Sequence, residues 1–167
     1  MDYTLGNESL ELFLRRKNKE SESKRKTIDW EEKKQQWLAW VDKLYGEIND
    51  WLNPLRHDGI VKINYENTTL KEDYLGSYPV KSMTIIVGTE YVSLKPKGVV
   101  LVNSWGRVDM MGDDGSIMFI LIETKDDISV TNQPKLQWHI AVRTPEMKYW
   151  KLTKDSFTDA LKQVMQK

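Results

Sequence analysis

The sequence predicts an α+β protein, in which a mostly antiparallel, meandering sheet packs on a long N-terminal amphipathic helix and a short C-terminal helix. Apolar residues recur every three or four positions between Trp37 and Leu55, which is the pattern of one buried helix face. After Gly59 the apolar residues alternate with polar ones, which is the pattern of half-buried strands. Short turns separate these segments, and sequential strands joined by short turns usually pair with their neighbours.

The long helix is expected to begin after Asp29, whose side chain can cap it, with Glu32 three residues on as in a capping box. We expect this helix to end near Asn53, because Pro54 follows and the residue before a proline avoids the helical region. Its apolar stripe consists of Trp37, Val41, Leu44, Ile48, Trp51 and Leu55, and Trp40 and Leu52 widen it.

The remaining pattern predicts strands near residues 61–65, 80–87, 91–95, 99–103, 107–111, 116–123 and 136–142. The segment 116–123 is apolar on both faces, which favours a central strand that is covered on both sides. A closing helix is predicted after Thr153 or Asp155, either of which can cap it. Its apolar face would contain Phe157, Leu161, Val164 and Met165.

The N-terminal third differs from the rest in charge. Residues 8–17 predict a short helix with Asn7 as a possible cap and Leu10, Phe13 and Leu14 on one side. Residues 15–26 hold seven basic and two acidic residues and nothing apolar, so they predict a solvated helix end or a linker. We therefore expect a charged helical extension or linker over 1–26 and a single α+β domain over 27–167.

Composition narrows the possible function classes. Lys plus Arg and Asp plus Glu both number 25, and the zero net charge argues against a dedicated nucleic-acid binder. The chain has no Cys, so thiolate catalysis and thiolate-held metals are excluded. The N-terminus lacks the pattern of a secretory signal, and the apolar runs are short for a membrane helix. These features predict a cytoplasmic protein without a membrane partner.

Sequence motifs of catalysis are missing as well. There is no nucleophile elbow, phosphate-binding loop or dinucleotide fingerprint, and Ser104-Trp105-Gly106 does not substitute for one. The two histidines, His57 and His139, lack a helical-turn partner that would suggest a metal site. The sequence therefore predicts neither a cofactor nor a metal, and it leans away from an enzyme.

A ligand site around Arg107, Asp109, Asp113 and Asp114 is one alternative. Alternation along a strand places Arg107 and Asp109 on one face, and the other two acids lie in a Gly-rich turn. Such carboxylates could bind a cation through oxygen or act as acid and base on a sugar or phosphate. The competing interpretation is a surface ion pair and ordinary Asp-Gly turn chemistry.

The leading hypothesis is a non-enzymatic interaction module, such as a regulatory subunit, an inhibitor or an adaptor, that uses its N-terminal helical region. Four Trp residues lie between positions 30 and 51, which exceeds what one helix face hides. Exposed Trp and Arg are enriched among binding hot spots, so the candidate contact residues are Trp30, Trp40, Arg15 and Arg16. The expected partner is another protein or a second copy. A nucleic-acid accessory protein using residues 15–26 is the second alternative.

Overall fold

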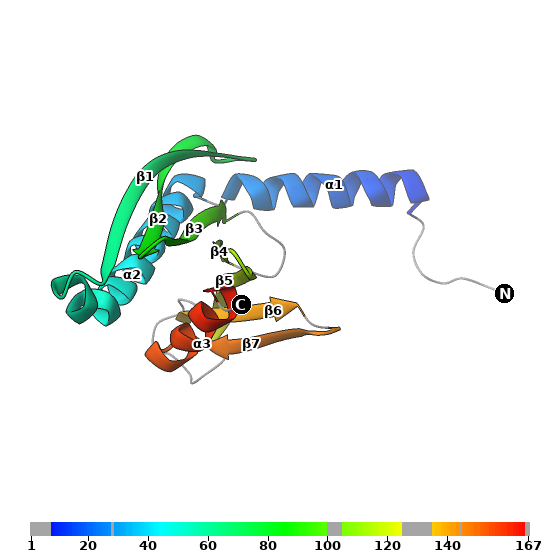
Figure 1. Cartoon of the computed structure of the whole chain (residues 1–167). Helices are drawn as coiled ribbons and strands as arrows, with labels where there is room; N and C mark the ends of the chain where they lie inside the picture. The colour runs from blue at the N-terminus through cyan, green and yellow to red at the C-terminus, as the bar shows by residue number, and fades with distance from the viewer. Residues whose placement is uncertain (1–7, 28, 100–104, 125–134, 144, 166–167) are drawn as a thin grey trace.

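The computed structural model describes residues 8–27, 29–99, 105–124, 135–143 and 145–165. The described residues form three helices and seven strands, which follow one another along the chain (Figure 1). The helices are α1 (Leu10–Thr27), α2 (Trp30–His57) and α3 (Lys154–Met165). The strands are β1 (Val61–Glu72), β2 (Gly76–Val87), β3 (Glu90–Gly98), β4 (Arg107–Gly112), β5 (Gly115–Thr124), β6 (Lys135–Arg143) and β7 (Met147–Lys151). The predicted α+β class is confirmed.

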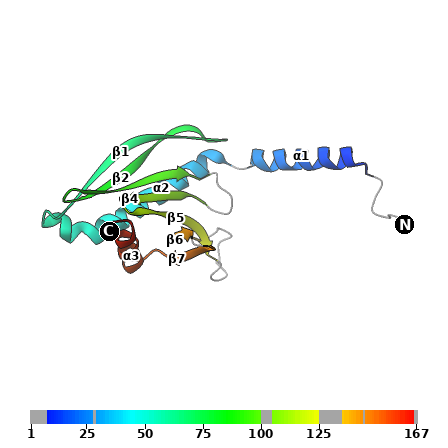
Figure 2. The same cartoon turned by 45° about the vertical axis from the view of Figure 1, so that its right-hand side comes forward.

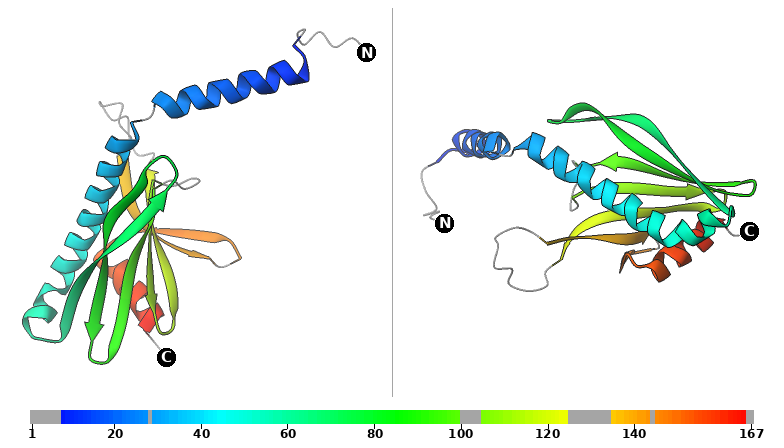
Figure 3. Two further views of the ribbon diagram at one scale, coloured as in Figure 1. Left: turned by 90° about the horizontal axis from the view of Figure 1, so that it is seen from above. Right: turned by 90° about the vertical axis from the view of Figure 1, so that its left-hand side faces the viewer.

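All seven strands belong to one sheet, and their order in space is their order in the chain. Every neighbouring pair is antiparallel, so the predicted meander is also confirmed. Helix α2 and helix α3 cover the same face of the sheet, because Trp51 of α2 contacts Phe157 of α3, which contacts Phe119 of β5. Helix α1 projects away from this body in every view (Figures 1, 2 and 3).

Helix α2 begins as the sequence predicts. The Asp29 carboxylate accepts a hydrogen bond from the Glu32 backbone N–H at 3.0 Å, which caps the helix. The buried residues of this helix are Trp37, Val41, Leu44, Tyr45, Ile48 and Leu52. Trp51 is only partly buried, and Leu55 is 40% exposed, so the predicted stripe is wrong at its C-terminal end. Leu52 takes the buried position there.

The predicted end of α2 at Asn53 is also wrong, because the helix continues through Pro54 to His57. A proline lacks one helical N–H, but near a helix end this removes a single hydrogen bond. The helix ends just before Gly59, whose φ of 75° few other residues adopt readily. The Ile60 N–H donates to the Leu55 carbonyl oxygen at 2.9 Å, which closes the helix end.

Two strands are longer than their alternation suggested. Strands β1 and β2 pair without interruption from Val61–Val87 to Glu72–Gly76, so the mostly polar residues 66–72 belong to β1. Along β2 the buried side changes between Val80 and Met83, which an alternating pattern would not reveal. The predicted strand at 99–103 falls mainly on residues 100–103, which lie outside the described residues.

The sequence pattern does not predict the last strand, β7. All five of its residues are exposed, so no alternation of buried and exposed positions marks it. Its place in the sheet comes from pairing with β6, from His139–Lys151 to Arg143–Met147. The closing helix α3 follows, and its N-terminal cap is Thr153, whose hydroxyl accepts from the Ser156 N–H at 3.1 Å.

The core lies between the sheet and the two helices α2 and α3. Trp37 and Trp138 lie 6.2 Å apart between ring centroids, and the Trp138 Nε1–H donates to the Trp40 carbonyl oxygen at 3.0 Å. These contacts fasten α2 to β6, which is distant in the sequence. The predicted face of α3 is largely confirmed: Phe157 and Val164 are buried, Leu161 and Met165 are partly buried, and Ala160 is buried as well.

Candidate functional site

Helix α1 carries a group of exposed apolar side chains at its start. Leu10, Leu12, Phe13 and Leu14 are 75%, 59%, 40% and 54% exposed. We call these four residues the α1 apolar patch. The hydrophobic core contains no described residue of α1. Each large apolar side chain would gain about 1.5–3 kcal/mol on full burial, so this patch is a strong candidate for contact with a partner.

Charged residues surround the patch and pair with one another. The Arg16 guanidinium binds Glu8 through two hydrogen bonds and Glu20 through a third, at 2.9–3.0 Å. Arg15 pairs with Glu11 at 2.9 Å. The predicted contact residues Arg15 and Arg16 are thus exposed, but each already binds acidic side chains close to it in the sequence. This arrangement lowers the local positive charge and does not favour phosphate binding by these two residues.

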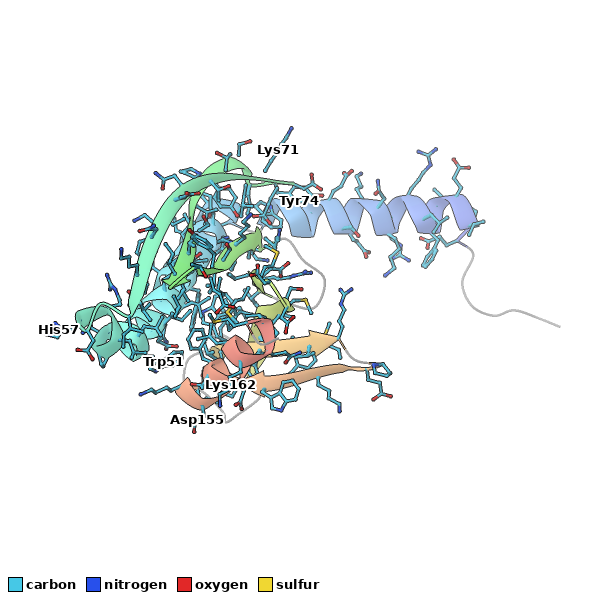
Figure 4. All side chains as sticks on the ribbon, viewed as in Figure 1. Trp51, His57, Lys71, Tyr74, Asp155 and Lys162 are labelled. Atoms are coloured by element: carbon cyan, nitrogen blue, oxygen red, sulfur yellow. The ribbon has the colours of Figure 1, made fainter. Side chains whose placement is uncertain are left out.

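The two candidate tryptophans are more enclosed than a free anchor would be. Trp30 stacks on Tyr74 of the β1–β2 hairpin, with ring centroids 4.9 Å apart, and Lys33 lies over the same ring. Figure 4 shows Tyr74 at the tip of that hairpin. Trp40 is partly buried against the core, and Lys43 covers its ring at 4.6 Å. Both rings are therefore occupied by contacts within the chain.

The alternative ligand residues do not converge. Arg107 and Asp109 form a two-point ion pair at 2.7 and 2.9 Å, and the pKa of Arg107 is raised by its hydrogen bond to Asp109. They alternate with the core residues Val108 and Met110, so they lie on the sheet face that is turned away from α2. Asp113 follows β4 at its far end, roughly 20 Å from Arg107 at strand spacing.

The turn that holds Asp113 and Asp114 packs against α3. The Asp114 N–H donates to the Val164 carbonyl oxygen at 2.9 Å. A Cβ atom on Gly112 would lie 2.5 Å from the same oxygen, so this approach requires glycine. Both aspartate side chains are exposed. The turn therefore fastens β4–β5 to the end of α3, and this contact accounts for Gly112 without a ligand.

A polar cluster that the sequence did not reveal lies beneath the β1–β2 hairpin. The Glu72 carboxylate accepts hydrogen bonds from the Tyr78 hydroxyl and, at 2.8 Å, from the Val99 N–H. Burial and the Glu72 partner raise the pKa of Tyr78 above its ordinary value. A Cβ atom on Gly98 would lie only 2.1 Å from the Glu72 carboxylate, so the glycine admits this side chain. The cluster fastens the hairpin to the end of β3.

An open groove lies between the β6–β7 hairpin and α3, with a cavity volume of about 440 Å³. Ile117, Ile140 and Val142 form its floor, and Lys148 and Trp150 of β7 form one wall. The other wall is Ser156, Asp159, Ala160 and Gln163, which share one face of α3 at helical spacing. We call this cavity the β7–α3 groove. Because four separate elements (β5, β6, β7 and α3) build it, no local sequence pattern could have predicted it.

Among the described residues, no group of three or more His, Asp or Glu side chains could hold a metal ion. The His139 Nδ1 lies 3.1 Å from the Gln137 carbonyl oxygen, and His57 is exposed at the end of α2. In the described part of the chain, no helix is long and apolar enough to cross a membrane. No protein-family model, curated protein or solved structure matches the chain.

Proposed function

We propose that the protein is a non-enzymatic interaction module that binds another protein, or a second copy of itself, through the α1 apolar patch. The observation that supports this proposal is the exposure of four large apolar side chains on a helix that contributes no described residue to the core. A helix presenting apolar residues at positions i, i+3 and i+4 suits the groove of a partner. Leu10, Phe13 and Leu14 have this spacing.

The charges of α1 would form the rim of such an interface. Arg15 and Arg16, with the acidic residues that they bind, flank the apolar side chains. Rim charges contribute mainly to association rate and specificity, whereas buried apolar anchors supply most of the affinity. Trp30 and Trp40 contribute less in this proposal than the sequence suggested, because contacts within the chain already enclose them.

The test compares the wild-type chain with a variant that carries Leu10→Ser, Phe13→Ser and Leu14→Ser. Affinity capture from nuclease-treated lysate, with quantitative mass spectrometry, should recover a stoichiometric partner with the wild type and lose it with the variant. Sedimentation velocity at several concentrations should show self-association of the wild type if the partner is a second copy. The matched control carries Lys19→Ser and Glu22→Ser, two exposed α1 positions outside the patch, and should behave as the wild type.

Equal partner recovery and equal sedimentation for all three proteins would contradict the proposal. Nucleic acid that co-purifies before nuclease treatment, with salt-dependent binding, would instead favour the accessory role of residues 15–26. A cytoplasmic location belongs to the proposal as well. It rests on the lack of Cys in the sequence, and fractionation of cells that express a tagged chain tests it.

A further inference from the structure

The β7–α3 groove lies on the face of the sheet that α2 and α3 cover. Its floor residue Ile140 is two positions from Trp138, whose ring packs on α2, so both side chains point to that face. Lys148 and Trp150 pair with floor residues across the β6–β7 ladder, so they point to the same side. Helix α3 lies mainly over β4 and β5. The groove is thus the open part of this face, next to α3 and above β6 and β7.

The dimensions of the groove fit a helix that lies beside α3. Neighbouring strands are about 4.8 Å apart, so β5 and β7 are separated by roughly 10 Å, which is the diameter of a helix with its side chains. The α3 wall runs from Ser156 to Gln163, a length of about 10 Å or two helical turns. Ser156 and Ala160, one turn apart on this wall, are small, so a second helix can approach α3 to the usual distance of about 8–10 Å between axes. A short helix in the groove would therefore extend the layer that α2 and α3 form.

The chain itself carries a helix with a matching apolar stripe. Leu10, Phe13 and Leu14 form this stripe on α1, and none of them belongs to the core. With the aliphatic stem of Lys17 at its next position, the stripe also extends over two turns, or about 10 Å. It lies about 20 Å or more from the end of α1 at Thr27, and α1 projects away from the body (Figures 1 and 3). No described α1 residue lines the groove of the same chain, whereas the groove of a second copy can reach the stripe.

The charges of the groove and of α1 are complementary. Lys148 stands on the β7 wall and Asp159 on the α3 wall, and neither forms an ion pair with another described residue. On α1, Glu11 and Arg16 flank the apolar stripe on opposite sides, each roughly 110° from its centre at helical geometry. In one direction of α1 along the groove, Glu11 faces Lys148 and Arg16 faces Asp159, whereas the reverse direction brings like charges together. The present partners of these two α1 residues are exposed ion pairs of small energy, so they do not prevent the exchange.

We propose that the β7–α3 groove binds the α1 apolar patch of a second copy of the chain. The stripe of α1 lies on the apolar floor, with Phe13 against the ring of Trp150, and the helix direction is the one that places Glu11 beside Lys148. This inference rests on the proposed function, because it takes the α1 apolar patch as the interaction surface and names the partner. Each copy offers one patch and one groove, so two copies can exchange α1 and close as a two-fold dimer with two such contacts.

The test is complementation between two full-length variants, followed by sedimentation velocity from micromolar to about millimolar concentration. The triple Ser variant of α1 keeps the groove and loses the patch, and Gln163→Trp keeps the patch and fills the groove from an exposed rim position. The wild type should dimerise, and each variant alone should dimerise at least tenfold more weakly. An equimolar mixture of the two variants should form a 1:1 complex, because one intact patch and one intact groove remain. Contact between two patches or between two grooves cannot give this result.

Lys162→Trp is the matched control for the filled groove, because it adds the same ring to an exposed α3 position that does not line the groove. It should dimerise as the wild type does.

A charge exchange tests the direction of α1 in the groove. Lys148→Glu should weaken dimerisation at least about threefold, because it places two acids together. Adding Glu11→Lys to the same chain should restore it. Glu22→Lys makes the same change of charge three turns further along α1, so its combination with Lys148→Glu should stay weak.

Three results would overturn this inference. They are a wild type that stays monomeric, dimerisation that Gln163→Trp leaves unchanged, and a mixture of the two variants that forms no 1:1 complex. The proposed function survives each of them if the triple Ser variant still loses self-association or a captured foreign partner, and it fails only if that variant loses neither. If Gln163→Trp does not fold, the charge exchange decides, since equal rescue by Glu11→Lys and Glu22→Lys, or none by either, contradicts the assigned contact.

Discussion

Individual aromatic residues carry much of the stability of the core. Trp138 is almost fully buried, and its indole N–H bonds to the backbone of α2. Phe157 of α3 is also buried and contacts both Trp51 and Phe119. Trp51, by contrast, stays partly exposed and packs on Phe157 from the edge of the core. Residues of the same chemical kind therefore differ in what their removal should cost.

We expect Phe157→Ala to lower the free energy of unfolding by about 3–5 kcal/mol, because it leaves a cavity in the core. Trp51→Ala should cost less, about 1–3 kcal/mol, because part of that ring already contacts solvent. Urea denaturation followed by circular dichroism measures both. A Trp51→Ala cost equal to or above that of Phe157→Ala would show that the ring is more deeply packed than described.

Two buried tyrosines should make stability depend on alkaline pH. Burial, as the largest cause, raises the pKa values of Tyr45 and Tyr78 in the folded state. An unfolded tyrosine ionises near pH ~10, so above that pH the unfolded state binds fewer protons and stability falls. The contribution is fully present below pH ~10 and is lost as the pH rises toward the folded values.

The double variant Tyr45→Phe and Tyr78→Phe should therefore lose less stability between pH 9 and 11 than the wild type, as measured by urea denaturation at each pH. Tyr91→Phe, at an exposed position, is the control and should keep the wild-type slope. Identical slopes for all three proteins would show that these phenols ionise alike in the folded and unfolded states.

Glycine has opposite roles in two elements. In the turn after β4, Gly112 allows the chain to approach the end of α3, and a Cβ atom there would lie 2.5 Å from the Val164 carbonyl oxygen. In α2, Gly46 is exposed, and nothing lies within 4 Å of the Cβ position. The first glycine is required by packing, and the second only weakens the helix that contains it.

We expect Gly112→Ala to destabilise the protein by about 1–3 kcal/mol, because the turn must move away from α3. Gly46→Ala should stabilise it by about 0.5–1 kcal/mol through helix propensity. Thermal denaturation of the two variants side by side measures the signs. Two changes of the same sign would show that the turn does not depend on its contact with α3.

Elements with a regular apolar period could be predicted from the sequence. Elements that depend on pairing or packing with other parts of the chain could not. The α2 stripe from Trp37 to Ile48 and the alternating strand β6 follow local periodicity. Strand β7 has no buried residue and exists only through its pairing with β6. The Glu72 cluster and the β7–α3 groove join residues from separate elements, so their chemistry depends on tertiary contacts that local patterns do not encode.

At the scale of the whole molecule, α1 stands outside the packed body. The core draws on α2, α3 and the sheet, and it contains no described residue of α1. Deletion of residues 1–26 should therefore leave a folded protein whose free energy of unfolding changes by less than about 1 kcal/mol. Urea denaturation of the shortened chain beside the full one measures this. A loss of cooperative unfolding would show that the N-terminal segment completes the core.

The order of elements along the chain has a consequence for synthesis in the cell. Each strand of the sheet pairs with the strand made just before it, so hairpins can form as the chain emerges from the ribosome. The core face of β5 stays uncovered until α3 has been made. Phe119 contacts Phe157, which is translated 38 residues later. At usual elongation rates that delay is roughly 2–8 s. During this interval the apolar surface that α3 later covers stays exposed, and such transiently exposed surface favours contact with chaperones.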